Sequence, residues 1–174
     1  MMAGQRIQIL LVEDDPDDVL LTTEVLREAE MPSDLHVALD GEEAMDFFRR
    51  RGRFAAAPVP DLVLLDLNLP KKDGRQVLAE IKADPTLRSI PVIVLTTSAA
   101  APDVLHAYDA HVNAYIRKPV GYTALLDVVR SIKDFWLRVV LLPVRDADPD
   151  ASTLETRIEQ THLEVPEGEA HSAP

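Results

Sequence analysis

The stretch Asp61–Pro70, DLVLLDLNLP, decides the fold class, because an apolar strand runs directly into a carboxylate and then into a proline-terminated loop. Apolar residues in succession, as in Leu62–Leu65, are typical of a strand that is covered on both faces of a parallel sheet. Open α/β sheets carry their chemistry at the carboxyl ends of their strands. Asp66, the residue at this strand end, is therefore the first candidate functional residue.

Short apolar runs alternate with stretches of helical period along the chain, which predicts a doubly wound α/β fold with helices on both faces of a parallel sheet. The second run is the most mixed and is expected at an edge of the sheet. The expected strands are Ile7–Val12, Leu35–Leu39, Leu62–Leu65, Val92–Thr96 and Ala114–Arg117. The expected helices begin at Pro16, Gly41, Asp73, Pro102 and Tyr122, and the first, capped by Asp15, should end near Glu30.

Charged and hydroxyl side chains also stand at the other expected strand ends. The first strand is followed by Glu13 and Asp14, the fourth ends in Thr96, and the fifth is followed by Lys118. Packed carboxylates resist ionisation unless a hard cation neutralises them, and Mg²⁺ favours a few carboxylates together with phosphate oxygens. A lysine and a hydroxyl suit the oxygens of a phosphoryl group. The pattern predicts Mg²⁺-assisted phosphoryl transfer to Asp66.

Composition narrows the class of protein. At 174 residues with 47% hydrophobic content, the chain can hold one ordinary core and little more. It contains no cysteine, which excludes disulfides, thiolate metal sites and a thiol nucleophile. No segment reaches the run of about 18 apolar residues that spans a bilayer, and a net charge of -12 argues against a nucleic-acid partner. We expect a cytoplasmic protein that uses neither a membrane nor a nucleic acid as its partner.

The last helix is expected to run from Tyr122 to about Leu141, and its apolar stripe is longer than one sheet face can cover. Such a patch on a monomer favours a homodimer, so residues 122–143 form the expected dimerisation element. Beyond residue 143 acids, serine and proline become frequent, which predicts a folded domain over 1–143 and a disordered acidic tail over 144–174. The expected interface residues are Ile132, Phe135, Trp136 and Val139.

With these signatures in order at the right strand ends, the chain from about Gln5 to Ile132 resembles a response-regulator receiver domain of two-component signalling. The resemblance implies a (βα)5 sheet in the flavodoxin-like order 2-1-3-4-5. It makes Asp66 the phosphoacceptor and makes Glu13 and Asp14 the acidic pair that holds Mg²⁺, with Asn68 adding its backbone carbonyl. Glu13 stands where many receivers have an aspartate.

The same resemblance assigns the residues that respond to phosphorylation. Thr96 matches the switch hydroxyl, Tyr115 matches the aromatic switch, and Lys118 matches the lysine of the family's active site. Pro119 matches a proline that typically follows a cis peptide bond in this family.

Two further features narrow the resemblance to the stand-alone response regulators that partner bacterial phytochromes. The segment His111–Tyr115 replaces the Gly-Ala pair that is usual before the fifth strand, and Phe135-Trp136-Leu137 extends the last helix. This narrower resemblance implies a phytochrome-type sensor histidine kinase, a bacteriophytochrome, as the partner. It also implies a homodimer built on the last strand, the last helix and its extension.

The expected function is that of a stand-alone response regulator in a phosphorelay, a signalling protein whose only catalysis is Mg²⁺-dependent self-phosphorylation and dephosphorylation. A phosphorylation-independent dimerising scaffold is one alternative. A phosphatase with an aspartyl nucleophile is another, but such enzymes need an acid at the position of Asn68. A flavin carrier needs a phosphate-binding loop after the first strand, where this chain is acidic and repels phosphate.

Overall fold

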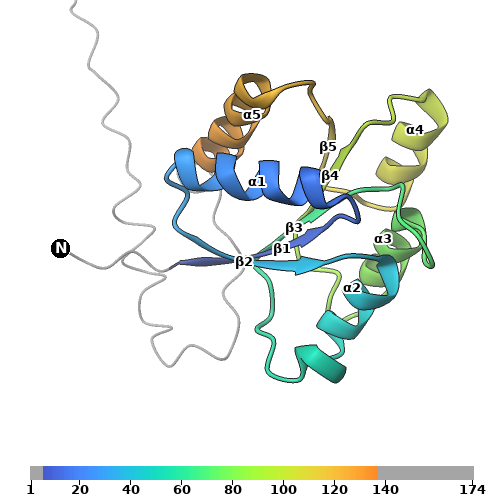
Figure 1. Ribbon diagram of the computed structural model, residues 1–174. Coiled ribbons are helices and arrows are strands. Elements are labelled where there is room, and N and C mark those ends of the chain that lie inside the picture. The colour runs from blue at the N-terminus through green and yellow to red at the C-terminus, as the bar shows by residue number, and fades with distance from the viewer. Residues whose placement is uncertain (1–5, 137–174) are drawn as a thin grey trace, which may run out of the picture. The chain divides into compact units, whose positions relative to one another are not determined.

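Five parallel strands form one sheet in the order β2-β1-β3-β4-β5 in the computed structural model, which describes residues 6–136 (Figure 1). The fold class and the strand order predicted from the sequence are confirmed. The strands are β1 (Ile7–Val12), β2 (Ser33–Ala38), β3 (Leu62–Leu65), β4 (Val92–Thr96) and β5 (Ala114–Arg117). The helices are α1 (Pro16–Glu28), α2 (Gly41–Phe48), η1, a short 3-10 turn (Gly52–Phe54), α3 (Gly74–Ala83), α4 (Ala101–Asp109) and α5 (Tyr122–Asp134).

Helices α1 and α5 cover one face of the sheet, and α2, α3 and α4 cover the other (Figure 1). Successive residues of β1 alternate between these two layers. Leu10 and Val12 pack in the layer of α2 and α3, whereas Ile9 and Leu11 pack in the layer of α1 and α5. Because β1 and its neighbour β3 are buried on both faces, their sequences lack the polar alternation of a half-exposed strand.

Helix α1 begins as the sequence predicts and ends slightly earlier. The Asp15 side chain accepts a hydrogen bond from the backbone N–H of Asp17 at 2.8 Å, and Pro16 occupies the first position of the helix. The helix ends at Glu28 rather than near Glu30, because Glu30 adopts the left-handed backbone conformation, with a φ of 52°. The cap fixes the first turn of α1 directly after the end of β1.

The edge strand β2 differs from its predicted range, Leu35–Leu39. It begins at Ser33, which pairs with Ile7 of β1, and Asp34 accepts a hydrogen bond from the side chain of Gln8 at 3.0 Å. Leu39 lies outside the strand, and the residue is 47% exposed. At an edge the backbone pairing sets the extent of the strand, so polar residues join it although the apolar run begins later.

The chain leaves β5 through a trans Lys118–Pro119 peptide bond, since residues 6–136 contain no cis bond. The cis bond expected from the resemblance is therefore wrong for this structure. The trans form of an X–Pro bond is the more stable one by about 0.5–1 kcal/mol. The turn into α5 is made by Gly121, whose φ of 95° is accessible to glycine without strain.

The predicted C-terminal features lie mostly outside the described residues. Helix α5 ends at Asp134, and the structure follows the chain as far as Trp136. The predicted continuation to Leu141, the interface residue Val139, the domain boundary at residue 143 and the acidic tail all fall beyond that point. Within the described part of the chain, no helix has the length and hydropathy needed to cross a membrane.

Candidate functional site

Asp66 lies at the carboxyl end of β3, in the middle of the sheet, and only 7% of the residue is exposed. Its backbone N–H donates to the carbonyl of Val12 at 3.0 Å, which continues the pairing of β3 with β1. Gly74, the first residue of α3, packs against it so closely that a Cβ at Gly74 would stand 2.1 Å from the Asp66 carbonyl oxygen. The position of Gly74 thus requires glycine, and the packing of α3 fixes the backbone of Asp66.

Both carboxylate oxygens of Asp66 have hydrogen-bond partners. Oδ1 accepts from the hydroxyl of Thr96 at 2.8 Å and from the backbone N–H of Asn68 at 3.0 Å. Oδ2 accepts from the ammonium of Lys118 at 3.3 Å. The ends of β3, β4 and β5 therefore bring together the acid, the hydroxyl and the lysine that the sequence places at separate strand ends.

Lys118 contacts three carboxylates through one buried ammonium group. Its Nζ donates to Glu13 Oε2 at 2.6 Å, to Asp18 Oδ2 at 2.7 Å and to Asp66 at the longer distance given above. Glu13 is 3% exposed and Lys118 is 9% exposed. The sequence interpretation missed Asp18, because an acid in the first turn of a helix is already explained by the helix dipole.

The three carboxylates share the single positive charge of Lys118. Burial disfavours the charged form of an ionisable group. Burial raises the pKa of Glu13 above its ordinary value, and the hydrogen bond and charge of Lys118 offset only part of that effect. Burial by itself lowers the pKa of Lys118, but the hydrogen bonds to Asp18 and Glu13 outweigh it, so the pKa of the ammonium is raised. Lys118 therefore stays positively charged.

The predicted metal ligands are hard oxygen donors at one edge of the sheet. Glu13 and Asp66 are buried, whereas Asp14 and Asn68 are exposed next to them. Within residues 6–136, no group of three or more acidic or histidine side chains is already arranged so that it could hold a metal ion. Carboxylate and carbonyl oxygens are the donor atoms that a hard divalent cation prefers. The ammonium of Lys118 contacts two of these acids, Glu13 and Asp66.

This edge of the sheet falls within residues 9–130, which match the family model of the response regulator receiver domain. The chain belongs to the response regulator receiver domains. Members of this family are signalling proteins of two-component phosphorelays, and receiver domains bind a divalent metal. The family and the fold that the resemblance implied are thus confirmed.

Similar proteins cover most of this receiver domain. The response regulator Rcp1 of Synechocystis sp. is 49% identical over 135 residues, which make up 78% of this chain and 92% of Rcp1. The crystal structure of the phosphorylated cyanobacterial phytochrome response regulator RcpA has a TM-score of 0.76 at 49% identity and covers 80% of this chain and 100% of its own. The crystal structure of the Mn²⁺-bound form of Rcp1 has a TM-score of 0.74 at 48% identity and covers 79% of this chain and 99% of its own.

The two predicted switch residues of the receiver domain meet at one loop residue, Ser98. The hydroxyl of Tyr115 donates to the backbone carbonyl of Ser98 at 3.1 Å, and the backbone N–H of Ser98 donates to the Thr96 hydroxyl oxygen at 3.5 Å. The hydroxyl of Ser98 donates in turn to Asp103 of α4, which pairs with Arg75 of α3 at 2.7 Å. Burial raises the pKa of the half-buried Tyr115. The sequence interpretation missed this connection, because Ser98 carries no motif of its own.

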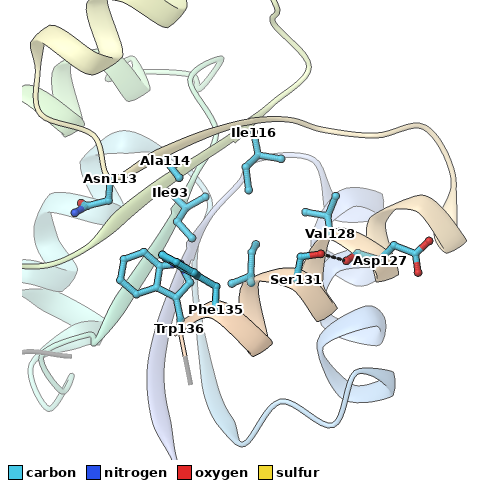
Figure 2. Close-up of a pocket in the computed structure, with 10 residues that line it drawn as sticks. Ile93, Asn113, Ala114, Ile116, Asp127, Val128, Ser131, Phe135 and Trp136 are labelled. Atoms are coloured by element: carbon cyan, nitrogen blue, oxygen red, sulfur yellow. Dashed lines mark hydrogen bonds between the residues drawn. The ribbon is translucent and has the colours of Figure 1, made fainter. Parts of the chain in front are cut away.

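Three of the predicted interface residues, Ile132, Phe135 and Trp136, line an open cavity of about 400 Å³ between β5 and α5 (Figure 2). Ile132 and Trp136 are 6% and 8% exposed and pack in the core layer of α1 and α5, whereas Phe135 is 51% exposed. The rings of Phe135 and Trp136 meet edge to face at 5.5 Å. The sheet therefore covers the apolar stripe of α5 as far as Trp136, which is further than the sequence predicts. Phe135 remains on the surface. The cavity lining includes Ile93, Ala114, Ile116, Val128, Ile132, Phe135 and Trp136.

Proposed function

We propose that this receiver domain accepts a phosphoryl group on Asp66 from the phosphohistidine of a sensor histidine kinase. The observation that carries the proposal is the buried Asp66 carboxylate, which contacts the Thr96 hydroxyl and the Lys118 ammonium at the carboxyl edge of the sheet. In the transfer an oxygen of Asp66 attacks phosphorus, the N–P bond of the kinase breaks, and the leaving imidazole takes up a proton. The product is an acyl phosphate on Asp66.

The residues around Asp66 supply the charge that the transferring group requires. The Lys118 ammonium and the hydroxyl of Thr96 are positioned to hold phosphoryl oxygens as negative charge gathers on them. We assign Glu13, Asp14, Asp66 and the backbone carbonyl of Asn68 as the residues that would hold Mg²⁺. When bound, this ion neutralises the acids and the phosphoryl oxygens.

Phosphorylation changes the hydrogen bonds at the switch. An acyl phosphate on Asp66 offers new acceptor oxygens, so the Thr96 hydroxyl can leave the carboxylate and turn toward them. Ser98 links that hydroxyl to Tyr115, which supports a movement of the loop after β4 together with Tyr115 and α4. The signal then passes to other proteins through contacts on this face. The net charge of -12 disfavours a nucleic-acid partner, and we assign the function to the cytoplasm.

The phosphoryl donor that we propose is a phytochrome-type kinase, a bacteriophytochrome. The support comes from RcpA, described as a cyanobacterial phytochrome response regulator, which is 49% identical to this chain. A second relative of known structure, at 39% identity, is described as a response regulator in red light signalling of R. palustris.

A comparison of sensor histidine kinases tests this function. Phosphorylated phytochrome-type kinases should transfer label to the wild-type protein at least roughly tenfold faster than kinases of other sensor classes, a ratio that needs only about 1.4 kcal/mol of preference. Asp66→Asn should accept no label from any of them. Faster transfer from an unrelated kinase would reject the phytochrome partner alone, whereas absence of transfer from every kinase would reject the phosphoacceptor function.

We further propose that two copies of the receiver domain form a homodimer through the region of β5 and α5. The cavity beside β5 is lined mostly by apolar side chains, and the exposed ring of Phe135 stands at its rim (Figure 2). Among the described strands β5 is the last of the sheet, and its residues Ala114 and Ile116 line the same cavity. An apolar cavity with an exposed aromatic side chain is the kind of surface that a second subunit covers.

A further inference from the structure

Asp18 contacts the active site although no motif points to it. It lies in the first turn of α1, where its backbone N–H approaches the capping carboxylate of Asp15 at 3.4 Å. Its Oδ2 accepts a hydrogen bond from the Lys118 ammonium at 2.7 Å, and its side chain is 32% exposed. The carboxylate is thus fixed by a capped helix and is aimed at the lysine that serves Asp66.

The distances show that Lys118 is held mainly by residues other than Asp66. The ammonium lies at 2.6 Å from Glu13 and 2.7 Å from Asp18, but at 3.3 Å from Asp66. We propose that Asp18 is a positioning residue: it draws the Lys118 ammonium away from Asp66 and thereby limits the rate of phosphoryl transfer. This inference rests on the proposed function of Asp66 as the phosphoacceptor.

The physical reason is the redistribution of charge during transfer. Before the reaction, Lys118 faces three carboxylates, each of which takes a share of its positive charge. In the transition state, phosphoryl oxygens add negative charge near Asp66, and the ammonium stabilises them best if it moves toward them. Asp18 opposes that movement by holding the ammonium. Its own negative charge also repels an anionic donor.

The test measures the rate of phosphorylation by acetyl phosphate in the presence of Mg²⁺. Asp18→Asn removes the charge and keeps the shape of the side chain, and it should raise the rate constant roughly fivefold, the upper range for a partly exposed ion pair. Asp17→Asn is the matched control, because Asp17 is exposed in the same turn, whereas the Lys118 ammonium donates to Glu13, Asp18 and Asp66. Both Asp17→Asn and the charge-preserving Asp18→Glu should stay within about twofold of the wild-type rate.

A double-mutant cycle separates this role from a general effect of surface charge. In a Lys118→Gln background, Asp18→Asn should give no further rise, because the ammonium that Asp18 holds is gone. If the Lys118→Gln background reacts too slowly for a rate to be measured, the coupling between Asp18 and Lys118 is measured in the free energy of unfolding. An unchanged or lower rate in Asp18→Asn, or an equal rise without Lys118, would overturn the inference while label on Asp66 leaves the proposed function intact. Absence of label on Asp66 in the wild type would instead reject the proposed function.

Discussion

Replacing Lys118 by methionine should lower the free energy of unfolding of the receiver domain by about 3 kcal/mol, the cost of leaving buried charges without their partner. Glu13 and Asp66 are 3% and 7% exposed, and both lose the ammonium that they share. Urea unfolding at pH 7 without Mg²⁺ measures the change. Lys133→Met is the control, because Lys133 donates to the backbone carbonyl of Ala29 at 2.7 Å and should lose only about 1 kcal/mol.

Two conditions should narrow the gap between Lys118→Met and the wild type. Burial already raises the pKa of Glu13, so the folded state binds a proton more readily than the unfolded state does. Lowering the pH from 7 therefore favours folding of the variant, because a protonated Glu13 no longer needs the ammonium. Adding Mg²⁺ should also favour the folded variant, by roughly 2.7 kcal/mol at a hundredfold excess over its dissociation constant. It should favour the wild type less, because there the Lys118 ammonium already contacts Glu13 and Asp66. A variant as stable as the wild type at pH 7 without Mg²⁺ would show that the acids do not depend on Lys118.

Phe135→Glu should convert a dimeric wild-type protein into a monomer and raise the dissociation constant at least roughly thirtyfold, the effect of losing one interface hot spot. Phe135 is 51% exposed at the rim of the β5–α5 cavity, so the change should leave the fold of each subunit intact. Light scattering over a range of concentrations measures the assembly.

Leu105→Glu is the matched control for the dimer, since Leu105 is an apolar residue of α4 that is 65% exposed and lies away from the cavity. It should remain as dimeric as the wild type. A monomeric wild type would rule out the dimer itself. A Phe135→Glu variant that stays dimeric while Leu105→Glu dissociates would move the interface to α4.

The residues at the strand ends were predictable because parallel strands present their carboxyl ends at one edge. That rule alone brings Asp66, Thr96 and Lys118 together, and the structure has them within hydrogen-bond distance. Asp18 was not predictable in the same way. Its role depends on the direction in which the first turn of α1 faces, and a sequence gives the period of a helix but not its rotation against the sheet.

The outer parts of the fold show a second limit of the sequence. The apolar stripe of α5 was correctly recognised, but its period does not say how far the sheet covers it, and Trp136 proves to be buried while Phe135 is exposed. The start of β2 at Ser33 depends on backbone pairing with β1, which leaves no apolar signal. Ser98 links Thr96 to Tyr115 through its backbone groups, and those are the same for every residue type except proline.

The most direct test of the account is the mass of the intact protein after incubation with acetyl phosphate and Mg²⁺. The wild type should gain one phosphoryl group that is stable in acid and lost in base, as an acyl phosphate is. Asp66→Asn, which keeps the size of the side chain but removes the nucleophilic carboxylate, should gain none. A phosphoryl group added at full stoichiometry to Asp66→Asn would contradict the central claim that Asp66 is the phosphoacceptor.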